Sequence, residues 1–235
     1  MASNSQLRER ARNILGNKLF GEYWLYAVLV CFISTAISTA ASKFTSFDIY
    51  VYSNTISISI GAIIIFGPLA AGMANTFMKA SRTGEGAKVE NMFSGFKNFP
   101  STFMLGLMSS LFIFLWTLLF IIPGIVKMYS YSMAYYIKND HPEYNWKQCL
   151  NESKRMMKGN KGKLFCLHLS FIGWIIVGAL CLGIGILWVW PYIYVSTVEF
   201  YNELLAKETD FTVNPEDDTQ NNTASENTEQ EEYSL

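Results

Sequence analysis

Few side chains in this chain could do chemistry, and two groups of them lie within long apolar stretches. The first group is Lys127, which is followed by Tyr131 and Tyr135. If the stretch crosses a membrane, a charge within it costs roughly 2.5–3.5 kcal/mol on insertion scales and suggests a functional role. One hypothesis is that Lys127 faces a polar cavity holding an anionic headgroup or solute, with the tyrosines lining it. The alternative is that the Lys127 stem reaches the outer interface and the tyrosines bond across helices.

The second group consists of His168, Glu199 and Glu203, near the ends of two apolar stretches expected to pair antiparallel. All three would lie about one turn from the same end of this pair, where they could share a proton as relays in transporters do. The alternative is an interfacial polar cluster that locks the two helices together. The four cysteines and two histidines have no spacing typical of a metal site, so we expect no metal and no cofactor.

Motifs of the common enzyme classes are missing from the sequence. There is no H-E-x-x-H, no G-x-S-x-G and no phosphate-binding loop of the G-x-x-x-x-G-K-[ST] type. The Gly-rich residues 84–88 follow no predicted strand, and no Ser or Thr follows Lys88. We therefore expect no catalytic residues, although the enzyme question stays open.

The distribution of charge indicates a multi-pass membrane protein. Of the 18 Lys and Arg residues, only Lys43 falls in a predicted outer loop and only Lys127 within an apolar stretch. Short cytoplasmic loops are enriched in Lys and Arg, so the basic connectors and both termini are expected in the cytoplasm, below the cell membrane. Since the topology by itself accounts for the basic residues, we expect no nucleic-acid partner. The first two spans are predicted at 23–41 and 56–78, separated by a polar outer loop.

Two further apolar stretches are too long to be single spans. Residues 102–137 would form a helix of about 54 Å, whereas the hydrocarbon core is about 30 Å thick. The basic flanks require an even number of crossings, and Pro123 with Gly124 can break the helix. A tight outer turn between two spans is one interpretation, and a re-entrant hairpin is the other. Residues 164–205 repeat the pattern, with an outer turn near Gly183. The predicted spans are 102–121, 123–138, 164–182 and 187–205.

Two amphipathic helices are expected to lie on the inner membrane surface. In the segment 5–19, apolar residues recur at helical spacing with Arg8 and Arg12 on the flanks. In the connector 141–163, Asn145 precedes Gln148 as a capping pair does, ahead of an apolar face. The fold class is therefore all-α: a polytopic membrane helical bundle of about six transmembrane helices in three hairpins, plus two interfacial amphipathic helices.

The last 28 residues differ in composition from the rest. Residues 1–207 contain 18 basic and 10 acidic residues, whereas 208–235 contain nine acidic and no basic residues. Such a segment is too poor in apolar residues to bury a core. We predict an integral membrane domain over 1–207 and a disordered acidic cytosolic tail over 208–235.

Several motifs resemble a bacterial family of multi-pass membrane proteins catalogued as domain of unknown function 975. The resemblance covers about residues 5–206 and implies an integral membrane protein without an assigned activity. The residues that carry it are Ile122-Pro123-Gly124-Ile125-Val126-Lys127, Tyr129-Ser130-Tyr131-Ser132-Met133-Ala134-Tyr135-Tyr136, Glu152-Ser153-Lys154-Arg155-Met156-Met157-Lys158-Gly159, Leu169-Ser170-Phe171-Ile172-Gly173-Trp174, Gly183-Ile184-Gly185, Trp188, Pro191-Tyr192 and Phe200-Tyr201-Asn202-Glu203-Leu204.

The sequence favours a non-enzymatic, transport-related or accessory membrane module that binds lipid, solute or a partner protein. Spans interrupted by Gly and Pro favour this function, because broken helices expose backbone groups that can coordinate a ligand. The alternative is a membrane-embedded enzyme acting on lipid or cell-envelope precursors through Glu199, His168 or Lys127. The expected partners are membrane lipids, and either another membrane protein or a second copy of the chain.

Overall fold

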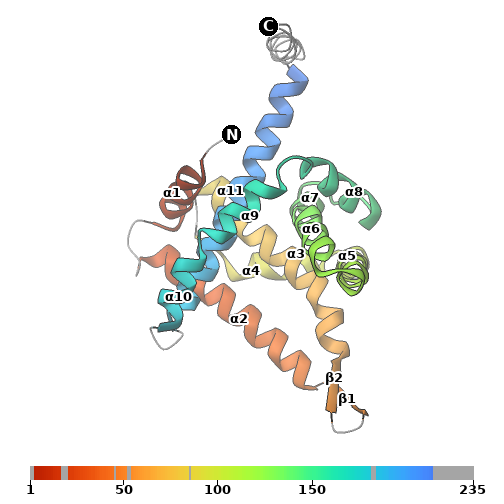
Figure 1. Cartoon of the computed structure of the whole chain (residues 1–235). Helices are drawn as coiled ribbons and strands as arrows, with labels where there is room; N and C mark the ends of the chain where they lie inside the picture. The colour runs from red at the N-terminus through yellow and green to blue at the C-terminus, as the bar shows by residue number, and fades with distance from the viewer. Residues whose placement is uncertain are drawn as a thin grey trace, which may run out of the picture. The chain divides into compact units, whose positions relative to one another are not determined.

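The computed structural model is almost entirely helical (Figure 1). It describes residues 3–16, 21–44, 46–51, 54–84, 86–180 and 184–213. Residues Ala2–Tyr201 form one compact unit, and the chain from Asn202 onward belongs to a second. The last helix is described to Val213, six residues into the predicted tail, and residues 214–235 lie outside the described part.

The elements follow one another as helices with a single pair of short strands among the described residues. They are α1 (Asn4–Leu15), α2 (Glu22–Phe44), β1 (Ser46–Val51), β2 (Asn54–Ser59), α3 (Ile60–Thr83), α4 (Val89–Met92), the 3-10 helix η1 (Phe93–Phe96), α5 (Phe99–Leu119), α6 (Ile121–Tyr131), α7 (Ala134–Asp140), α8 (Trp146–Met156), α9 (Lys161–Leu169), α10 (Ile172–Leu180) and α11 (Ile184–Val213).

Among the described residues, four helical segments are long and apolar enough to cross a membrane, judged by length and composition. They correspond to the predicted first, second, third and fifth spans, and the helical membrane bundle is thereby confirmed as the fold class. The fourth predicted span is divided between α6 and α7, and the sixth lies in α11, which is not among the four. Those two crossings stay predictions. The four segments are Glu22–Lys43, Gly61–Thr83, Phe99–Leu119 and Lys161–Gly178.

The connection between α2 and α3 is a β-hairpin rather than the predicted loop. Strands β1 and β2 pair antiparallel, from Ser46 opposite Ser59 to Val51 opposite Asn54. Polar and apolar residues alternate over Ser46–Ile49 and Thr55–Ser59, a period of two that is typical of strands. The second span accordingly begins at Ile60 instead of residue 56.

Helix α3 packs in backbone contact with the connector that follows it. A side chain on Gly72 would overlap the Met92 carbonyl, and one on Gly95 would overlap the Pro68 carbonyl. Small residues permit such close approach of helices. The Thr102 hydroxyl donates to the Gly95 carbonyl at 2.9 Å. The connector over 79–101, predicted only as a cytoplasmic loop, therefore folds back against the helical bundle through α4 and η1.

A tight hairpin joins α5 and α6, as Pro123 predicted. The chain reverses at Phe120, the N-cap of α6, and Pro123 lies in the first turn of that helix. Gly124 contacts Thr117 so closely that a β-carbon there would overlap its backbone. The two helices remain side by side up to Phe112 and Tyr131, whose ring centroids are 6.4 Å apart.

Helix α8 packs against the break in the predicted fourth span. Its N-cap is the expected pair, because Asn145 and Gln148 each accept a hydrogen bond from the other's backbone amide. Its apolar face is buried, and within that face the Ser153 hydroxyl donates to the Ser130 carbonyl at 2.8 Å. The same hydroxyl accepts from the Met133 amide at 3.2 Å. Ser153 thus satisfies the backbone groups that are freed where α6 ends and α7 begins.

Candidate ligand-binding cavity

In the first predicted group, Lys127 and Tyr131 pack within the α5–α6 hairpin, whereas Tyr135 of α7 packs against α3. The Lys127 ammonium lies 4.7 Å from the centre of the Trp116 ring, a cation–π contact across the hairpin. Tyr131 packs against Phe112, and the ring of Tyr135 meets Phe66 edge-on at 6.5 Å. The cation and both aromatic residues are therefore engaged in contacts between helices.

The residues of the second predicted group have separate hydrogen-bond partners. His168 Nδ1 lies 3.3 Å from the Tyr129 hydroxyl, and His168 Nε2 lies 3.3 Å from the Thr197 hydroxyl. Glu199 accepts a hydrogen bond from the Ser81 hydroxyl of α3. Glu203 belongs to the second compact unit and is not placed relative to the other two. His168 thus joins α6, α9 and α11, while Glu199 joins α11 to α3.

The structure contains a third polar group, which the sequence analysis did not predict. Arg82 donates two hydrogen bonds to the Asp140 carboxylate, at 2.6 and 2.8 Å. The Tyr201 hydroxyl donates to the same carboxylate at 3.0 Å, and its ring stacks on Tyr136. This cluster connects the ends of α3 and α7 to Tyr201 within α11. The sequence did contain a signal for this ion pair. An acidic residue lies at the end of one apolar stretch, and an arginine lies at the end of another.

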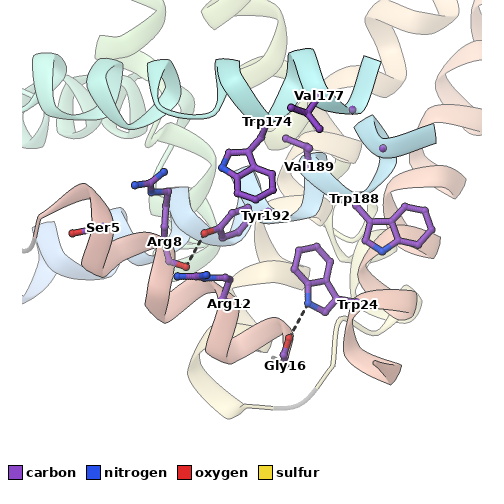
Figure 2. A pocket seen from close by; sticks show the side chains of 12 residues that line it. Ser5, Arg8, Arg12, Gly16, Trp24, Trp174, Val177, Trp188, Val189 and Tyr192 are labelled. Atoms are coloured by element: carbon purple, nitrogen blue, oxygen red, sulfur yellow. Dashed lines mark hydrogen bonds between the residues drawn. The ribbon is translucent and has the colours of Figure 1, made fainter. Parts of the chain in front are cut away.

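A cavity of about 500 Å³ lies between α1, the start of α2, α10 and α11 (Figure 2). Two hydrogen bonds hold α1 over it. The Trp24 indole donates to the Gly16 carbonyl at 2.9 Å, and the Tyr192 hydroxyl donates to the Arg8 carbonyl at 3.1 Å. The lining residues are Ser5, Arg8, Arg12, Gly16, Trp24, Trp174, Val177, Gly178, Gly185, Trp188, Val189 and Tyr192.

The lining is apolar and aromatic on one side and cationic on the other. Figure 2 shows Arg8 and Arg12 on the same side of α1, next to Tyr192, with Trp174 on the facing helix. In the described part of the chain, no carboxylate forms an ion pair with either arginine. The Arg8 Nε donates to the Asn4 carbonyl at 3.3 Å, within its own helix. The cavity therefore presents two guanidinium groups beside a hydrophobic wall.

Close helix contact shapes the far end of the cavity. Gly178 of α10 and Gly185 of α11 approach so closely that a β-carbon on either would overlap the other's backbone. The sequence predicted α1 on the inner surface and the turn after α10 on the outer one. Yet α1 lines the same cavity as Gly178 and Gly185, which lie on either side of that turn in the sequence. The sequence analysis did not predict this site because Arg8 and Tyr192, which are in contact in the structure, are far apart in the sequence.

The helical architecture and the cavity beneath an amphipathic helix define a protein of the polytopic membrane class. The chain belongs to the family described as "Protein of unknown function (DUF975)", whose profile matches residues 1–131 and 121–208. The family resemblance seen in the sequence motifs is thereby confirmed. No curated protein and no solved structure matches the chain. The family description carries no activity, so function has to be argued from the geometry.

Proposed function

We propose that this protein is a non-enzymatic module of the cell membrane that binds a membrane-resident ligand in the α1 cavity. Its termini lie in the cytoplasm, in keeping with the basic connectors. The observation that carries the proposal is the cavity itself. Its walls are α11 together with α2 and α10, and the last two belong to the apolar segments that are long enough to cross a membrane. The amphipathic helix α1 covers it and places two arginines in its lining.

The geometry of the other polar residues supports binding over catalysis. A general base or nucleophile needs an open position next to the reacting group. His168 uses both ring nitrogens in contacts with Tyr129 and Thr197, and Lys127 is stacked on Trp116. Neither residue lines the α1 cavity. These contacts are those expected of side chains that connect helices.

A cavity-filling variant tests the binding function. Val177→Trp places a large side chain into the cavity from an exposed position on α10. We expect the purified full-length variant to lose one co-purifying lipid, solute or protein that mass spectrometry detects with the wild type. The matched control is Ile176→Trp, an exposed neighbour that does not line the cavity. An unchanged set of co-purifying species in Val177→Trp would contradict the proposal.

Alanine substitution of Lys127, His168 and Glu199 tests the alternative enzymatic function. If the residues connect helices, the variants lose some thermal stability, and cells that express them have the same lipid and envelope composition as wild-type cells. A lipid product present with the wild type and absent with a folded His168→Ala variant would favour an enzyme instead.

A further inference from the structure

We propose that the α1 cavity is a site for one anionic phospholipid, whose phosphate is bound by Arg8 and Arg12. This inference rests on the proposed binding function and names the chemical class of the ligand. The acyl chains would follow the apolar wall of Trp174, Val177 and Val189 toward the close contact between Gly178 and Gly185.

The charge of the site calls for an anion. Arg8 and Arg12 are four residues apart on α1, so their side chains are neighbours on one face. Like charges at this spacing destabilise a helix unless an anion lies between them. A guanidinium group donates two parallel hydrogen bonds to a phosphate, and two such groups can hold its oxygens together. Since no described carboxylate pairs with these arginines, their charge is available to a ligand.

Two other polar side chains of the cavity are hydrogen-bonded within the protein. The Trp24 indole and the Tyr192 hydroxyl donate to carbonyls of α1 and its C-cap. They position the helix that bears the arginines rather than add donors for a ligand. The two guanidinium groups are therefore the main polar determinants, and the ligand needs only one charged end.

The apolar wall distinguishes a lipid from free phosphate. Trp174 and Val177 are 55% and 56% exposed, on a helix that belongs to a membrane-type apolar segment. A hydrocarbon chain lying on them would enter from the bilayer without crossing water. The cavity volume of about 500 Å³ is within the usual range for small-molecule sites. A free anion would leave this surface uncovered, so the observations favour a lipid.

Retention of lipid by the full-length protein tests the site. The protein is reconstituted into phosphatidylcholine vesicles that contain one tenth phosphatidylglycerol, extracted in mild detergent and analysed for bound lipid by mass spectrometry. We expect phosphatidylglycerol to be enriched over its share of the vesicle. The double variant Arg8→Gln/Arg12→Gln should retain about tenfold less of it, because charge-assisted hydrogen bonds are lost.

The control removes one positive charge from the same helix outside the cavity. Arg10 is exposed and does not line the cavity, so Arg10→Gln should retain phosphatidylglycerol as the wild type does. Thermal unfolding of each variant in detergent confirms that it is folded. Equal retention by the double variant and the wild type would overturn the inference. So would displacement of the lipid by inorganic phosphate alone, which would identify a phosphate site without a lipid requirement.

The cavity-filling variant separates failure of this inference from failure of the proposed function. If phosphatidylglycerol is not enriched but Val177→Trp still loses another co-purifying species, the lipid assignment is wrong and the binding function stands. If Val177→Trp and the wild type retain the same species, both are wrong.

Discussion

The turn between α2 and α3 and the turn between α5 and α6 reverse the chain in opposite chemical settings. The first is a β-hairpin whose sequence contains Asp48, Asn54 and several hydroxyl residues. The second consists only of apolar residues, with Leu118 to Ile122 each between 63% and 76% exposed. Polar residues at a turn are stabilised by water, whereas exposed Phe and Ile are stabilised by hydrocarbon. The comparison favours a re-entrant α5–α6 hairpin that ends inside the bilayer.

The described end of α10 resembles the apolar turn between α5 and α6. Leu180 is 80% exposed, and the adjoining Gly178 and Gly185 line the same cavity as α1. An amphipathic helix lies at the membrane surface, within the headgroup region. Helices whose residues share a cavity with such a surface helix need not reach the opposite surface at that point. Length and apolar composition alone therefore do not distinguish a crossing helix from one that enters and returns.

Labelling of single cysteines should give the largest difference between the two turns. In a chain without its native cysteines, Asp48→Cys should react fully with a membrane-impermeant maleimide added outside intact cells. Ile122→Cys should not react, because its turn is expected in hydrocarbon. Both should react after denaturation. Equal labelling of the two positions would mean that the α5–α6 turn also reaches water, as expected for two complete crossings.

The native Cys149 provides a separate labelling test in the purified wild-type protein. It is fully buried, and burial raises the pKa of its thiol to about 11. Since the folded state disfavours the thiolate, little reactive thiolate exists near neutral pH, and the fraction rises only as the pH approaches 11. In the wild type, Cys149 should stay unlabelled in the native state and react on unfolding.

A charge placed at each turn should give the next largest difference. Ile122→Lys puts an ammonium into the apolar turn and should destabilise the inserted state by roughly 2.5–3.5 kcal/mol. Thr55→Lys adds the same charge to the polar turn and should have little effect. The fraction of chain that resists alkaline extraction from membranes measures the difference. Similar insertion of both variants would contradict a hydrocarbon location for residue 122.

The sequence predicted those features that depend on neighbouring residues. Periodicity and capping identified α1 and α8, and Pro123 indicated the α5–α6 turn. The break after Tyr131 depends on Ser153, and the Asp140 cluster depends on Arg82 and Tyr201. The cavity needs α1 to meet α11. Such contacts join distant parts of the chain, so no local pattern reveals them.

Removal of the Asp140 charge should destabilise the C-terminal end of α7, which lies at the other end of the α5–α7 segment from the α5–α6 turn. Asp140→Asn loses the ion pair with Arg82 and weakens the bond from Tyr201. We expect a loss of about 1–2 kcal/mol in unfolding free energy, because Arg82 is 43% exposed and solvent screens part of the pair. Glu143→Gln changes an exposed carboxylate in the same connector and serves as the control. Equal stability of the two variants would show that the cluster does not hold this segment.

The smallest effect on stability is expected at the break between α6 and α7. This break leaves α6 too short to cross the hydrocarbon core by itself. Ser153→Ala removes the hydroxyl that bonds the Ser130 carbonyl and the Met133 amide, leaving two buried backbone groups without this partner. We expect a loss of about 1 kcal/mol, measured by thermal unfolding in lipid nanodiscs. Ser170→Ala, whose hydroxyl bonds only a carbonyl one turn back, is the control. If Ser153→Ala matches the control, the break persists without Ser153, and its cause lies in the α6–α7 segment itself.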